Sequence, residues 1–242
     1  METAKRLEAA KRLEAARRAL ARAEESVGLS SAPSGAGAPA GEWSVPDALS
    51  WLFPRGLSRG MTVGVRGSRL AALLVAGIAS GAGAWSVFLG CAGTGWAVAA
   101  SLGVDLDRTV CVPRVGEAAR SQVLAAAVDG FDVAVIGSSV RLDARERRLL
   151  AKRALTRSCL LIAEGWPARR CVVGRFDGVE GLERGAGHIS TIRLSIGRAS
   201  EPGRTVLIDS AGWRAGEPAR LLRPPASASA SAAARSLRAV SA

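Results

Sequence analysis

Five short apolar runs alternate with helix-forming segments in the middle of this sequence, and no other feature restricts the fold as strongly. The runs are rich in Val, Leu, Ile and Ala and are bounded by Gly, Pro, Asp or Ser, as buried strands are. Strands that alternate with helices favour an α/β fold, with a mostly parallel central sheet flanked by helices. The predicted strands are 61–65, 84–90, 108–112, 131–137 and 158–163.

The segments between these runs have helical patterns, which predict helices at 68–79, 95–102, 117–128 and 143–157. Asp143 is the predicted N-cap of the last of them. Its inner face is predicted to carry four leucines, Leu142, Leu149, Leu150 and Leu155. The pattern then changes, because apolar and polar residues alternate in 188–197 and 204–213 around a Glu-Pro-Gly turn. This alternation predicts a terminal antiparallel hairpin.

The two ends of the chain differ from this central domain, which is predicted to span 45–223. Residues 1–27 read as a charged amphipathic helix, followed by a flexible Ser/Pro/Gly linker at 28–44. Residues 224–242 read as a disordered Ala/Ser/Pro tail. The helix either lies on its own domain or docks on a partner. In the second case its contacts are Leu7, Leu13 and Leu20.

The formal net charge of +12 favours an acidic partner, nucleic acid first. Only three of the cations are lysines, so a GC-rich coding bias toward Arg also accounts for part of the excess. Cys91, Cys111 and Cys159 lie in apolar runs and are expected to be small buried hydrophobes. With His188 as the only histidine, a zinc site and a Ser-His-Asp triad are both disfavoured, and no metal is expected.

Residues 70–104 carry no charge over a length that could cross a bilayer. Gly-rich breaks within this stretch predict instead a helix, a strand and a second helix, and no membrane association. The N-terminus is charged and does not read as a signal sequence. We therefore expect a cytoplasmic protein.

The stretch MTVGVRGSRLAALLVAG at 61–77 has the outline of a phosphate-binding loop, which requires G-x-x-x-x-G-K-[ST]. Counting from Gly64 places Arg69 at the second glycine, Leu70 at the lysine and Ala71 at the hydroxyl position. Counting from Gly67 fails as well, because Ser and Arg then replace the Lys and hydroxyl residues. The stretch is interpreted as a vestigial loop that binds no cofactor, formed by Gly64, Arg66, Gly67, Ser68 and Arg69.

Three separated segments, RGLSRGMTVGV, SLGVDLDRTVCV and DGFDVAVIGSSVRL, resemble the core of RecA-type recombinases over residues 48–222. In that family the FDVAVI strand ends in an Asp that helps to hold magnesium, and the matching residue is Gly137. The strand AWSVFLG leads to a catalytic Glu, and Cys91 takes its place. Without these groups phosphoryl transfer lacks its main sources of acceleration, so no enzyme activity is expected.

A RecA-like core with a degraded phosphate loop, a charged N-terminal helix and a low-complexity tail resembles the ImuA family, in its actinobacterial branch. The resemblance implies a non-catalytic adaptor in damage-induced mutagenesis, associated with the nucleoid when in its complex. The implied partners are ImuB, which is an inactive Y-family polymerase, and through the complex RecA and an error-prone replicative polymerase.

Two other functions stay open at this point. One is a SulA-type cell-division inhibitor that binds FtsZ, and the other is an ATP- or DNA-binding RecA paralogue with a non-standard nucleotide site. The segment 164–187 is predicted to be a loop, whose arginines either contact single-stranded DNA or are simply solvated. These candidate DNA contacts are Arg169, Arg170, Arg175 and Arg184. The oligomeric state stays open.

Overall fold

The computed structural model describes residues 41–183, 186–199 and 201–221. Several predictions fall outside these residues. They concern the helix 1–27 with Leu7, Leu13 and Leu20, the first part of the linker, Arg184, and the tail 224–242.

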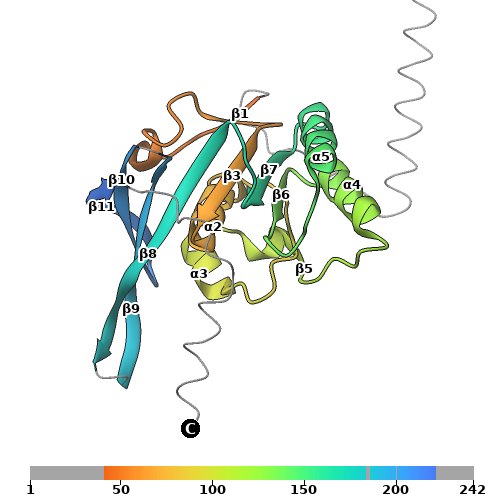
Figure 1. Ribbon diagram of the computed structural model, residues 1–242. Coiled ribbons are helices and arrows are strands. Elements are labelled where there is room, and N and C mark those ends of the chain that lie inside the picture. Colours follow the sequence, from red (N-terminus) through yellow and green to blue (C-terminus); the bar gives the residue numbers. More distant parts are fainter. Residues whose placement is uncertain (1–40, 184–185, 200, 222–242) are drawn as a thin grey trace, which may run out of the picture. The chain divides into compact units, whose positions relative to one another are not determined.

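Nine strands of the described residues form one sheet in the order β11-β10-β9-β8-β3-β7-β6-β4-β5 (Figure 1). The strands from β8 to β5 in this order run parallel, and β8 to β11 are antiparallel neighbours. Their bounds are β3 Thr62–Gly67, β4 Ser86–Leu89, β5 Thr109–Val112, β6 Val133–Ile136, β7 Leu160–Glu164, β8 Arg170–Glu183, β9 Ala186–Arg198, β10 Pro202–Asp209 and β11 Gly212–Leu221.

All five predicted parallel strands are present, and burial on both faces explains why the inner ones were recognisable, whereas the edge strand β5 has no buried residue. Every residue of β4 and β6 is buried, as are the first four of β7. A strand covered on both sides must be apolar throughout, which is why these runs were recognisable in the sequence. The predicted hairpin is also confirmed, because β9 and β10 pair antiparallel.

The prediction of a loop at 164–187 is wrong, because most of it forms β8, a sixth parallel strand. Beyond the body of the sheet, β8 and β9 continue as a two-stranded ribbon (Figure 1). The end of the predicted linker also belongs to the fold. There β1 (Glu42–Trp43) pairs with β2 (Leu57–Ser58), and Trp43 is buried.

Helices cover both faces of the parallel strands. The helices α2 (Arg69–Ser80) and α3 (Trp96–Ser101) pack into the larger hydrophobic core. Two 3-10 turns, η1 (Asp47–Leu49) and η2 (Leu106–Arg108), precede β2 and β5 in the chain. The helices α4 (Arg120–Gly130) and α5 (Ala144–Thr156) pack into a second core on the other face. Of α2, every residue from Ala71 to Ser80 is buried, as its Ala/Leu-rich sequence requires.

The capping prediction for α5 is confirmed, since the Asp143 side chain accepts from the N–H groups of Arg145 and Glu146 in a capping box. The predicted inner face is only half right. Leu142 and Leu150 are buried, whereas Leu149 and Leu155 are 60% and 66% exposed. The buried residues of α5 itself are Leu150 and Ala154. Leu149 and Leu155 are their immediate neighbours in the chain, so the helix turns each of these side chains by about 100° away from the sheet.

The uncharged stretch 70–104 divides into α2, β4 and α3, as its glycines indicated. Among the described residues, no helix combines the length and the apolar character needed to cross a membrane.

Gly77 provides a test of how closely α2 and α3 pack. A Cβ at this position would lie 2.0 Å from the carbonyl oxygen of Leu102, whereas a Cβ on Gly130, at the end of α4, would meet nothing within 4 Å. We expect Gly77→Ala to lower the free energy of unfolding by about 2–3 kcal/mol through overpacking. The control Gly130→Ala should leave it unchanged within about 0.5 kcal/mol or raise it. Urea denaturation measures both, and equal midpoints for the two variants would contradict the packing described here.

Candidate functional site

The turn between β3 and α2 is the place where a phosphate loop would lie, and it is too short to form one. Gly67 ends β3 and Arg69 begins α2, so Ser68 alone joins them. The Ser68 N–H donates to the Gly174 carbonyl at 2.8 Å, and the Ser68 Oγ accepts from Leu70 N–H as the helix cap. Phosphate binding needs several backbone N–H groups around the anion. Two of the N–H groups nearest to this turn, those of Ser68 and Leu70, already have partners within the fold.

The other predicted loop residues do not gather around this turn. Gly64 is buried inside β3, where an added Cβ would lie 2.5 Å from the Trp166 carbonyl oxygen. Successive side chains of a strand point to opposite faces of the sheet. The Val65 side chain packs into the core that contains α2, so the next residue, Arg66, lies on the opposite face. Gly67 has a φ of +82°, and a Cβ there would lie 2.1 Å from the Gly174 oxygen. Only Ser68 and Arg69 therefore stand at the helix N-terminus.

An ion pair takes the position in front of α2. The Arg69 Nε donates to Glu164 Oε1 at 2.6 Å and its Nη2 donates to Oε2 at 3.2 Å, a two-pronged contact. The Arg69 Nη1 also donates to the Ala92 carbonyl at 3.0 Å, and Ser138 N–H donates to Glu164 Oε2 at 3.0 Å. The pair thus connects α2 to the loops after β4 and β6 and to the end of β7.

The electrostatic consequence is that Arg69 is not available as an anion-binding cation. Its hydrogen bond to Glu164 raises the pKa of the guanidinium, against the opposing effect of burial. The Glu164 side chain is only 11% exposed. Sequence reasoning missed Glu164, although a carboxylate directly after a buried apolar run was a visible signal. Its partner could not be identified because it lies 95 positions earlier in the chain.

The positions that the RecA resemblance assigns to magnesium and to the attacking water are closed as well. A Cβ on Gly137 would lie 2.3 Å from the Gly90 oxygen and 3.0 Å from Cys91 Sγ. An Asp in its place is therefore sterically excluded. Cys91 is buried, and burial raises the pKa of its thiol to about 12. The Ser139 Oγ donates to the Gly90 carbonyl at 2.7 Å and holds the loop over this point.

The candidate DNA contacts are divided between two places. Arg169 and Arg170 lie together at the start of β8. Arg175 lies further along this strand and is paired with Asp177 at 2.7 Å. Of the two aromatic residues in the same segment, Trp166 is buried and Phe176 is 54% exposed. The structure therefore supports no continuous set of basic and aromatic side chains in this segment.

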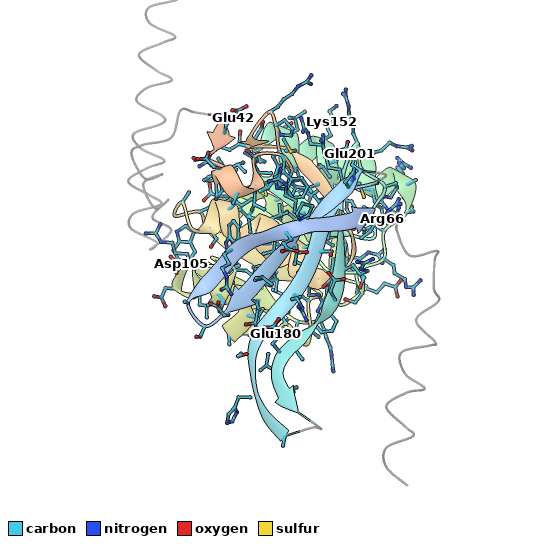
Figure 2. All side chains as sticks on the ribbon, turned by 90° about the vertical axis from the view of Figure 1, so that its left-hand side faces the viewer. Glu42, Arg66, Asp105, Lys152, Glu180 and Glu201 are labelled. Carbon is cyan, nitrogen blue, oxygen red and sulfur yellow. The ribbon has the colours of Figure 1, made fainter. Side chains whose placement is uncertain are left out.

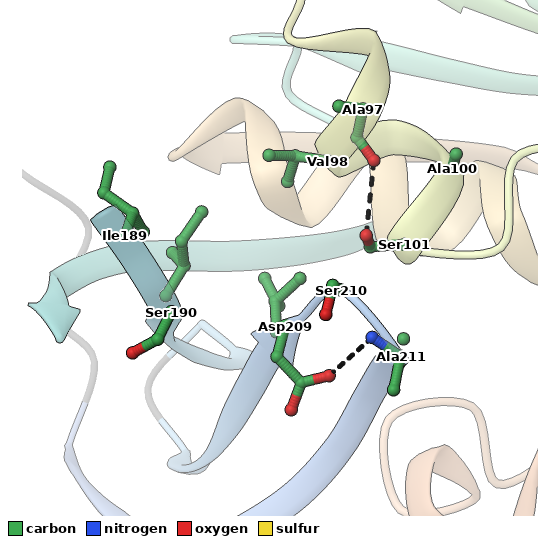
Figure 3. A pocket seen from close by; sticks show the side chains of 12 residues that line it. Ala97, Val98, Ala100, Ser101, Ile189, Ser190, Asp209, Ser210 and Ala211 are labelled. Carbon is green, nitrogen blue, oxygen red and sulfur yellow. Dashed lines mark hydrogen bonds between the residues drawn. The ribbon is translucent and has the colours of Figure 1, made fainter. Parts of the chain in front are cut away.

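A cavity of about 650 Å³ lies between α3 and the strands β9 and β10 (Figure 3). Its walls are mostly apolar, with Val98, Ile192 and Ile208 among them. Two of the polar side chains drawn in Figure 3 have partners, since Ser101 Oγ donates to Ala97 O at 3.3 Å and Asp209 accepts from Ala211 N–H at 2.9 Å. Asp209 is also paired with Arg214, so this carboxylate is not free to act as an acid or base in the cavity. The described residues also contain no group of three His, Cys, Asp or Glu side chains able to hold a metal.

Residues 51–168 are similar to the family described as the MT3502 N-terminal domain. The matched segment is just under half of the chain. It runs from the segment before β2 through α5 and β7, and it ends before β8. No curated protein matches the chain.

The Arg69–Glu164 pair can be weighed by a double-mutant cycle. We expect Arg69→Met and Glu164→Gln to show a coupling energy of about 2 kcal/mol, because each single change leaves a largely enclosed partner unpaired. The matched control is Arg193–Glu180, at 3.2 Å with both side chains 49% exposed, whose coupling should not exceed about 0.5 kcal/mol. Equal coupling in the two cycles, measured by denaturant unfolding, would refute a structural role for Arg69–Glu164.

The burial of Cys91 predicts its reactivity. Thiol reagents attack the thiolate, and burial raises the pKa of Cys91 and Cys159 to about 12, so both should be inert in the folded protein at about pH 8. The half-buried Cys111 and Cys171 should react first. Ellman's reagent followed by mass spectrometry measures the order, with denaturant releasing the remaining thiols. Rapid labelling of Cys91 in the folded protein would mean that this edge of the sheet is open.

Proposed function

We propose that this chain is a non-catalytic adaptor with a RecA-like core. It acts in damage-induced mutagenesis of the ImuA type, where it holds an ImuB-type inactive Y-family polymerase. RecA and an error-prone replicative polymerase join through this complex, which places the protein at the nucleoid in the cytoplasm.

One observation carries the non-catalytic part of the proposal, namely the Arg69–Glu164 pair at the N-terminus of α2. A helix N-terminus attracts an anion, and in nucleotide-binding folds the phosphate supplies it. Here Glu164 of the same chain supplies the negative charge and binds the cation that could have assisted. A nucleotide would have to break this pair and lengthen a one-residue turn before it could bind.

The arrangement of the strands supports the RecA-like part. The strand that leads to the vestigial loop, β3, lies inside the sheet between β7 and β8. Two strands, β7 and β6, separate it from β4, the next strand of the main sheet along the chain. A parallel strand inside the sheet that leads directly into a helix N-terminus is where nucleotide-binding α/β folds carry their phosphate loop. The antiparallel strands beyond β8 extend the sheet on the other side.

The test is calorimetry of the full chain with ATP and magnesium, together with a pull-down against an ImuB-type protein. We expect no heat of ATP binding at ATP concentrations up to about 1 mM, which corresponds to a binding free energy no more favourable than about −4 kcal/mol. We expect the ImuB-type protein to be retained in the pull-down. A RecA-type ATPase run in parallel shows that binding heat is detectable. Deletion of residues 1–27 should then reduce retention if that segment is the contact.

Three results would contradict the proposal. ATP binding at micromolar affinity would favour the paralogue with an unusual nucleotide site. Retention of FtsZ in place of the ImuB-type protein would favour the SulA-type inhibitor. Retention of neither protein, with the folded state verified by circular dichroism, would exclude the adaptor role in this complex.

A further inference from the structure

A second cavity, of about 630 Å³, opens at the amino ends of the parallel strands, the edge opposite to α2's N-terminus. The topology brings three segments to it. The parallel strand β8 begins there at Arg170, opposite Val63 near the start of β3. The antiparallel strand β9 ends there at Arg198, opposite Val172. The segment 52–55 between η1 and β2 forms the third wall.

The charge of this cleft is strongly unbalanced. Four arginines line it, together with one carboxylate, that of Glu201. Glu201 is paired with Arg198 at 2.6 Å. Among the described residues, no carboxylate lies within ion-pair distance of the other three guanidinium groups. These three belong to Arg55, Arg169 and Arg170.

One hydrogen-bond donor of the cleft also lacks a partner among the described residues. The Nε of Arg198 is enclosed and has no hydrogen-bond acceptor in the described part of the chain. A buried donor without a partner is costly, and this cost adds to the unbalanced charge of the cleft. The floor of the cleft is apolar, because Leu52, Phe53 and Val172 are all at most 3% exposed. A low-dielectric floor strengthens the field of the arginines above it.

We propose that this cleft binds the phosphodiester backbone of a nucleic-acid strand. Guanidinium forks match phosphate oxygens, and three unpaired forks spread over one open cleft suit successive phosphates better than a single ion. Among the described residues that line the cleft, the one aromatic side chain is Phe53, and it is buried. Binding therefore depends on charge without base stacking, and it is independent of sequence.

This site differs from the predicted set of DNA contacts. It includes Arg169 and Arg170 and excludes Arg175, which lies further along β8 and is ion-paired with Asp177. In Figure 2, Glu201 of the cleft lies near one end of the β8–β9 pair and Glu180 towards the other. The inference also goes beyond the proposed adaptor function, because an adaptor needs no strand-binding cleft to hold its protein partner.

The experiment is fluorescence anisotropy of the full chain with a labelled oligothymidylate of about 20 nucleotides, titrated at several salt concentrations between about 50 and 200 mM. The test variant is Arg55→Gln/Arg169→Gln. The matched control is Arg114→Gln/Arg141→Gln, which removes the same charge from exposed arginines in the loops after β5 and β6, at the opposite edge. Thermal unfolding verifies that both variants remain folded.

We expect the test variant to weaken binding roughly tenfold at low salt and to reduce the slope of log K against log salt by about 1.4, since each contact to a single strand contributes about 0.7. The control should change neither value appreciably. An equal loss in both variants, or no binding by the unmodified protein, would overturn the proposal. A polyglutamate peptide of equal length that binds as tightly would assign the cleft to an acidic protein instead. Complete displacement by inorganic phosphate at matched ionic strength would assign it to a free anion.

Discussion

The structure depends on a helix that is enclosed on every side. From Ala71 to Ser80, α2 is buried between the sheet and α3, so its sequence is apolar all round and contains a glycine where the Leu102 carbonyl approaches. A buried helix must still satisfy the free N–H groups of its first turn and the partial positive charge of its N-terminus. In this chain Ser68 caps the helix and the Arg69–Glu164 pair lies in front of it.

Internal satisfaction of that helix end accounts for the form of the neighbouring positions. Because Glu164 lies in front of the helix and binds Arg69, a one-residue connection suffices between β3 and α2. Gly137 allows the loops after β4 and β6 to approach closely, since a side chain there would meet the Gly90 carbonyl. Cys91 fits beside it as a small buried hydrophobe. Neither residue buries a charge that would need a partner.

The same physical reasoning shows what the sequence could and could not predict. Strands buried on both faces, such as β6 and β7, are continuous apolar runs and were predicted within a few residues. By contrast, β8 is half exposed, and register shifts near Asp177 and Gly181 interrupt its alternation, so no period of two is visible. The vestigial phosphate loop was inferred from missing residue types, and it stays a prediction. The Arg69–Glu164 pair was not predictable, because a contact between residues 69 and 164 exists only after the sheet has formed.

In open parallel sheets, ligands usually bind at the carboxyl ends of the strands, where helix N-termini and loops converge. In this protein that edge is occupied by its own side chains, with Arg69 bound to Glu164 and the Gly90 carbonyl bound to Ser139. The unpaired guanidinium groups of the second cleft lie at the amino ends instead. The opposite edge therefore carries an excess of positive charge, since among the described residues only Arg198 of the four cleft arginines has a carboxylate partner, Glu201. Under the proposal above, binding there requires this charge and no catalytic geometry.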